Sequence, residues 1–89
     1  MIEETVLPVV LDGQTYVLRG TASEERLRQA AAIVAQKIDA ARVTNPLYSY
    51  TRTAMLAALQ IAEEFLALQD ECREILEAAD IKWAATQPK

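Results

Sequence analysis

The stretch Leu56–Leu76, LAALQIAEEFLALQDECREIL, decides the fold of this chain. Its apolar residues recur at alternating steps of three and four, which predicts an amphipathic α-helix with one apolar stripe. The stripe consists of Ala58, Ile61, Phe65, Leu68, Cys72 and Ile75. A chain of 89 residues has little other material with which to cover it. What packs against the stripe is therefore the first question about function.

The helix that contains this stripe extends well beyond it on both sides. No Gly or Pro interrupts the chain between Ser49 and Ala84, so we expect a helix that begins at Ser49 or Tyr50 and reaches about Ala84. Such a helix is about 35 residues, or ~52 Å, long. Its segment Met55–Leu59 is apolar all round, which predicts burial on every side by the rest of the chain and a partner.

The N-terminal part of the sequence predicts a β-hairpin. Thr5–Leu11 and Thr15–Gly20 are rich in β-branched residues, and Asp12-Gly13 between them is a strong turn signal. Pro8 has no N–H to donate, so its strand is expected at an edge or with a bulge. A two-stranded hairpin is barely stable alone, and this one must pack on another element.

A first helix is predicted between the hairpin and the long helix, from Ser23 to Arg42. Ser23 is a good N-cap residue, and the acidic residues that follow it favour the start of a helix. Asn45-Pro46 then disfavours helical backbone and marks a turn. One face of this helix is apolar and consists of Leu27, Ala31, Val34, Ile38 and Ala41.

These elements define an α+β fold with one small head and one long helix. We expect residues 1–49 to form a ββα head, made of the hairpin and the first helix. Residues 50–89 form the long C-terminal helix, of which residues 50–61 pack in the head. The remainder is expected to form an oligomeric coiled coil.

The coiled-coil prediction rests on a heptad pattern. Ala58, Phe65, Cys72 and Ala79 occupy the a positions, and Ile61, Leu68 and Ile75 occupy the d positions. Leu76 adds an apolar residue at e, which widens the seam, so that a dimer or a larger assembly is possible. The alternative is that the stripe folds back on the first helix. That helix is too short to cover more than half of the second, so we predict a homo-oligomer.

Composition excludes several classes of function. The chain has a net charge of −4, no His and one Cys, so an intrachain disulfide and a His- or Cys-based metal site are excluded, and nucleic-acid binding is not expected. Adjacent carboxylates such as Glu63 and Glu64 point about 100° apart on a helix and do not converge on a substrate. We expect no enzyme and no cofactor. With no membrane span and no basic leader, a cytoplasmic location is predicted.

Charge is distributed unevenly between the two parts of the chain. The long helix is acidic, whereas the head is nearly balanced. The head is thus the better candidate for contact with an acidic partner. Its basic residues are Arg19, Arg26, Arg28, Lys37 and Arg42.

Three stretches of this sequence resemble the ZapA family of bacterial cell-division proteins. They are VVLDGQTYVLRG, EERLRQAAAIVAQKIDAAR and TNPLYSYTRTAMLAALQIAEEFLAL, in which AALQIAEE is the most specific part. Two positions depart from the family pattern. Gln60 stands where Asn is usual, and the neutral Gln14 stands where some members carry a basic residue after the hairpin glycine.

The resemblance implies a function that spacing alone does not. ZapA-like proteins bind FtsZ, the tubulin-like division GTPase, and cross-link its filaments at the septum without enzymatic activity. It therefore implies FtsZ filaments as partner, with the five basic head residues as candidate contacts, and a homodimer, with a tetramer as the alternative. Without the resemblance, a coiled-coil adaptor with a different partner fits equally well. The parallel or antiparallel direction of the coil stays open.

Overall fold

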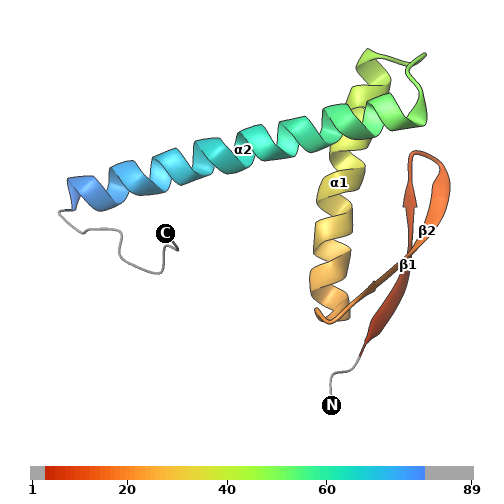
Figure 1. Cartoon of the computed structure of the whole chain (residues 1–89), viewed down its shortest axis with the longest axis horizontal. Helices are drawn as coiled ribbons and strands as arrows, with labels where there is room; N and C mark the ends of the chain where they lie inside the picture. The colour runs from red at the N-terminus through yellow and green to blue at the C-terminus, as the bar shows by residue number, and fades with distance from the viewer. Residues whose placement is uncertain (1–3, 80–89) are drawn as a thin grey trace.

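The computed structural model describes residues 4–79 and has the predicted α+β architecture. The elements are β1 (Thr5–Leu11), β2 (Gln14–Gly20), α1 (Glu24–Thr44) and α2 (Tyr50–Ala78), in that order. The hairpin lies against α1, and α2 crosses α1 and then extends far beyond it (Figure 1). This arrangement leaves most of α2 without cover from its own chain.

The hairpin has the register that its turn sequence dictates. Asp12 and Gly13 both have positive φ, at 55° and 77°, as a two-residue type I′ turn requires. Leu11 therefore pairs with Gln14, and the antiparallel ladder continues to the pair of Thr5 with Gly20. β2 begins at Gln14, one residue before the predicted start.

A serine caps the start of each helix, of which Ser23 was predicted as a cap and Ser49 only as a possible helix start. The Ser23 side chain accepts a hydrogen bond from the Arg26 backbone N–H, and Ser49 does the same for Arg52, each at 3.1 Å. α1 runs two residues beyond the predicted Arg42 before Asn45-Pro46 ends it. α2 ends at Ala78, short of the expected Ala84, and the segment 80–84 lies outside the described residues.

The core of the single chain is very small. Among the described residues, the buried apolar side chains are Leu7, Ile38, Ala41 and Ala57, with Thr53 the one buried polar residue. Leu7 lies on β1, and the other four lie on α1 and the start of α2, so the core forms where α1 packs on β1 and on α2. The predicted apolar face of α1 does point inward, since each of its five residues is buried or half-buried.

Within the single chain, the segment Met55–Leu59 is covered on one side of the helix, and its burial on the other sides by a partner stays a prediction. Ala57 is 2% exposed and Leu56 is half-buried, whereas Met55 and Leu59 are 61% and 65% exposed. The reason is geometric, because α1 crosses α2 and therefore covers one side of it. The radius of gyration, 17.1 Å, likewise exceeds the roughly 12 Å of a compact domain of this length.

Candidate functional site

The apolar stripe of α2 lies open along the part of the helix that projects from the head (Figure 1). Phe65, Leu68 and Ile75 are 58%, 57% and 64% exposed. Ala58 and Cys72 are also exposed, whereas Ile61 and Leu76 are half-buried. A regular helix sets these seven residues on one side, so they form a continuous apolar surface.

A second exposed apolar line runs beside this stripe. Met55, Leu59 and Leu66 follow one another at spacings of four and seven residues, and each is more than half exposed. The sequence predicted that the rest of the chain and a partner together bury Met55 and Leu59, and it did not single out Leu66. Their spacing of four and seven residues is typical of one helix face and could have identified them as a second apolar line. With this line, the open apolar surface of α2 is wider than the seam of a two-stranded coiled coil.

Three charged residues of α2 take part in ion pairs among the described residues. Glu64 forms an ion pair with Lys37 of α1 close to the helix crossing. Asp70 pairs with Arg73 at 3.3 Å on the exposed helix surface. Between the helices is an open groove with a mixed lining, formed by Gln36, Lys37, Ala40, Leu56, Leu59, Gln60, Glu63 and Glu64. These charged residues lie beside the apolar stripe, and none of them lies within it.

The basic residues proposed as partner contacts do not form one patch. Arg19 is on β2 and pairs with Glu4 at 3.5 Å, whereas Arg28 pairs with Glu24 at 2.6 Å in the first turns of α1. Arg26 is exposed and lies on α1 two residues before Arg28, which places the two side chains on nearly opposite sides of the helix.

Lys37 and Arg42 have partners within the fold. Lys37 bonds Glu64 and so joins α1 to α2. Arg42 lies near the other end of α1 from Arg26, about 24 Å along the helix at 1.5 Å per residue. Its guanidinium is mostly covered, with 27% of the side chain exposed. These two cations therefore have structural roles, besides any contact with a partner.

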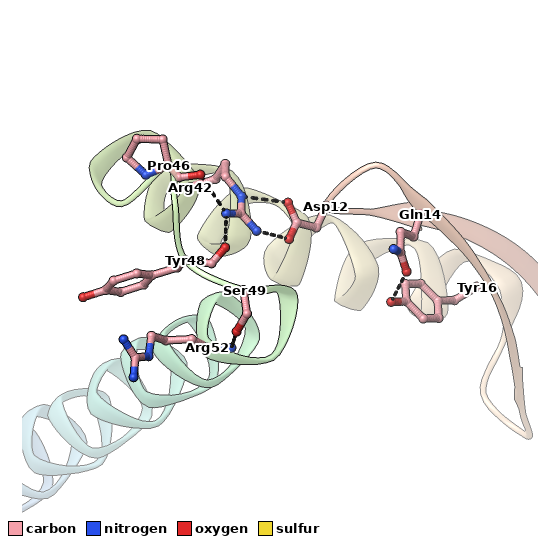
Figure 2. A network of polar contacts seen from close by, with 8 residues as sticks. All are labelled: Asp12, Gln14, Tyr16, Arg42, Pro46, Tyr48, Ser49 and Arg52. Carbon is pink, nitrogen blue, oxygen red and sulfur yellow. Dashed lines mark hydrogen bonds and ion pairs between the residues drawn. The ribbon is translucent and has the colours of Figure 1, made fainter.

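Arg42 is the centre of a polar network at the junction of the two helices (Figure 2). Its Nε and Nη2 donate to the Asp12 carboxylate at 3.1 and 2.6 Å, and its Nη1 donates to the carbonyls of Pro46 and Tyr48. The guanidinium also lies 5.8 Å from the centroid of the Tyr50 ring. Arg42 thus ties the hairpin turn to the loop between α1 and α2.

The network changes the acid–base behaviour of its two charged members. The hydrogen bonds from Arg42 lower the pKa of Asp12 below its ordinary value, although burial works in the opposite direction. The same hydrogen bonds raise the pKa of Arg42. Sequence reasoning listed Arg42 as a surface charge, because a pairing across 30 residues has no local signal.

Tyr48 and Arg52 form a second contact at this junction. The Arg52 guanidinium lies 5.1 Å from the centroid of the Tyr48 ring, which is cation–π geometry. Within residues 4–79, the Arg52 side chain has no carboxylate partner. A cation in the first turn of a helix faces the positive end of the helix dipole, and the aromatic face offsets that misfit.

The described part of the chain contains no group of three or more potential metal-ligating residues, and no helix in it is long and apolar enough to cross a membrane. Cys72 is exposed on α2, with no histidine anywhere in the sequence to activate it.

Comparison with known proteins gives the same family by sequence and by structure. Residues 7–87 match the family profile described as cell division protein ZapA. ZapA of Geobacillus thermodenitrificans is 35% identical over 68 residues, which cover 76% of this chain and 75% of that protein. ZapA of Bacillus subtilis is 26% identical over 73 residues, covering 82% and 86%. A solved ZapA mutant dimer from Geobacillus stearothermophilus superposes with a TM-score of 0.64 at 31% identity, covering 88% of this chain and 91% of that one.

Proposed function

Because the chain belongs to the ZapA family of cell division proteins, we propose that it binds FtsZ filaments and cross-links them at the division septum. It does so in the cytoplasm, as a non-enzymatic protein without a cofactor. Its activity consists of two kinds of contact, one between copies of this chain and one between each head and a filament. If the protein does not bind FtsZ, the alternative function is that of a coiled-coil adaptor with a different partner.

The observation that supports this function best is the open apolar stripe on the projecting part of α2. Phe65, Leu68 and Ile75 are each more than half exposed in the single chain. Burial of the exposed part of each side chain would contribute on the order of 1 kcal/mol to the free energy of association. A second copy offers the same stripe, and two such helices can bury each other by coiled-coil packing. The solved dimer of a relative is consistent with this pairing.

Self-association turns a weak filament binder into a cross-linker. The hairpin and α1 form the head and the start of α2 packs on α1, so the rest of the helix can serve as spacer and interface. Two heads on one dimer bind two sites at a high effective concentration, so modest contacts suffice for bundling. The added line of Met55, Leu59 and Leu66 gives room for a tetramer.

The head contact with the filament is best sought at the exposed cations. Arg26 and Arg28 lie at the start of α1 and are solvent-exposed, as is Arg19 on β2. Lys37 and Arg42 remain candidates, but their ion pairs join α1 to another element of the fold, whereas Arg28 pairs only with Glu24 on the exposed surface of α1 itself. Arg26 and Arg28 therefore test filament contact most cleanly.

Co-sedimentation with polymerised FtsZ at near-physiological salt tests the proposal. We expect the protein to be enriched in the pellet, and the double change Arg26→Glu with Arg28→Glu to reduce this enrichment while the oligomeric mass is unchanged. Arg73→Glu on α2 is the matched control and should bind as the parent does. No enrichment of the parent protein would refute the FtsZ proposal, and a pull-down from lysate would then identify the partner of an adaptor.

A further inference from the structure

In the hairpin, the backbone N–H and C=O groups of alternate residues point toward the other strand or away from it. The two-residue turn makes Leu11 and Gln14 a hydrogen-bonded pair, and such pairs alternate along an antiparallel ladder. The alternate pairs, Val10 with Thr15, Pro8 with Val17 and Val6 with Arg19, therefore direct their N–H and C=O groups away from the other strand. Each strand thus presents three residues at its free edge.

The two free edges differ in their capacity to accept another strand. On the β1 edge the middle residue is Pro8, which has no N–H, so that edge is interrupted. On the β2 edge Thr15, Val17 and Arg19 all retain their N–H groups. Outside the β1–β2 ladder, no backbone hydrogen bond within residues 4–79 involves these three residues. α1 packs on β1, and the half of β2 next to the turn lies farther from α1 than β1 does (Figure 1).

The unprotected edge belongs to a sheet that is too small to be stable alone. A two-stranded sheet is marginal in water, and proteins usually protect a free edge with proline, lysine, a bulge or a covering element. Within residues 4–79, β2 contains no proline, lysine or bulge and no other element pairs with its free edge, and its one charged side chain is that of Arg19. The outer face of the hairpin is also apolar, with Val6, Val10 and Val17 exposed by 51%, 62% and 58%. Both features favour addition of a strand at the β2 edge.

We propose that β2 pairs antiparallel with β2 of a second copy of this chain, forming a four-stranded sheet about a two-fold axis at Val17. The strand is complementary to itself in this register. Val17 faces Val17 of the second copy, and Thr15 faces Arg19, so no like charges are opposed. On the other face, Tyr16 of one copy faces Leu18 of the other, and the half-exposed tyrosine ring gains an apolar neighbour.

This contact is independent of the α2 stripe because the two surfaces share no residue. A chain with two separate isologous contacts can link dimers to one another. The β2 edge therefore adds a route by which α2-paired dimers form larger assemblies through their heads. A peptide segment of the filament could also add to the β2 edge, but no residue of β2 favours a particular peptide sequence. In the two-fold register, by contrast, β2 of one copy is complementary to β2 of the other.

Cysteine cross-linking tests the register directly. In a Cys72→Ala background, Val17→Cys places two thiols on residues about 5.5 Å apart between Cα atoms, within the range of a disulfide. Val10→Cys is the matched control, with similar exposure on the same face but at the β1 edge. Under mild oxidation we expect a covalent dimer at Val17→Cys at least about tenfold faster than at Val10→Cys. Equal rates, or no dimer from a Val17→Cys thiol that alkylates normally, would overturn the proposal.

A proline substitution tests the edge without new covalent chemistry. Val17→Pro removes one outward N–H and no bond of the β1–β2 ladder, and Val10→Pro does the same at the other edge. With folding checked by circular dichroism, Val17→Pro should lower the mass of assemblies above the α2-paired dimer, while Val10→Pro should not. Identical masses for parent and both folded variants would contradict pairing through β2. If Val17→Pro does not fold, the cross-linking comparison decides alone.

Discussion

Asp12 in the hairpin turn and Arg42 in the last turns of α1 form a two-point ion pair, with Nε–Oδ1 and Nη2–Oδ2 distances of 3.1 and 2.6 Å. The pair joins segments that lie 30 residues apart, and the same guanidinium also holds the carbonyls of Pro46 and Tyr48. Two parallel hydrogen bonds fix the geometry more tightly than a single one. The ion pair therefore sets where the hairpin lies relative to the helix junction.

Removal of the Asp12 charge should destabilise the head in a pH-dependent way. Arg42 lowers the pKa of Asp12 below its ordinary 3.8, so the folded state favours the ionised carboxylate. The stabilisation is fully present well above pH 3.8 and is lost as the pH falls through the lowered pKa of the folded state. Thermal melts should show Asp12→Asn below the parent in Tm at pH 7, with the difference shrinking in acid.

The control for this change is the exposed helical pair of Arg28 and Glu24. Glu24→Gln should leave Tm nearly unchanged, because surface pairs of this kind contribute about 0.3–0.5 kcal/mol. A Tm difference between Asp12→Asn and the parent that stays constant from pH 7 down to strong acid would show that the ion pair is not its cause.

Thr53 should be a position where a less polar residue raises stability. It is 1% exposed, and its hydroxyl makes no hydrogen bond in the structure. Thr53→Val keeps the shape and removes the unsatisfied group, which should stabilise the fold by about 1 kcal/mol and raise Tm by about 4–8 °C. Thr44→Val is the control, since the Thr44 hydroxyl is exposed and donates to Ala40 at 3.2 Å. A lower Tm for Thr53→Val at equal protein concentration would contradict this assignment.

The elements of the fold could be predicted because their signals are local. Asp12-Gly13 specifies the turn and hence the strand register, while Ser23 and Ser49 cap the helices. Each of these signals acts within about four residues of its own position. The α+β class and the order of elements follow from them without knowledge of the packing.

The packing of α2 on α1 could not be predicted from the same pattern. Periodicity shows which residues share a face, but it does not show the crossing of two helices. Met55 and Ala57 are both apolar residues of one segment, yet the crossing buries Ala57 and leaves Met55 exposed. The Asp12–Arg42 pair was missed for a related reason, because it joins two residues that only the folded chain brings together.

Oxidation of Cys72 should report the direction of the α2 pair. The thiol is free, exposed and at an a position of the heptad pattern. In a parallel, in-register dimer it faces Cys72 of the second copy, so mild oxidation should yield a covalent dimer that Cys72→Ala cannot form. An antiparallel pair centred elsewhere keeps the two thiols apart. Mild oxidation of the parent protein would then give no covalent dimer.

We expect bundling to depend on self-association through the α2 stripe. Phe65→Glu places a charge in that seam and should give a folded monomer, because burial of an unpaired charge is strongly unfavourable. Ala67→Glu adds the same charge about 200° round the helix and should leave the dimer intact.

Light scattering by FtsZ polymers with each variant, at equal head concentration, is the most direct test. We predict that the parent and Ala67→Glu bundle the filaments, whereas Phe65→Glu binds but does not bundle. Bundling by a Phe65→Glu protein that is monomeric by sedimentation would contradict the account.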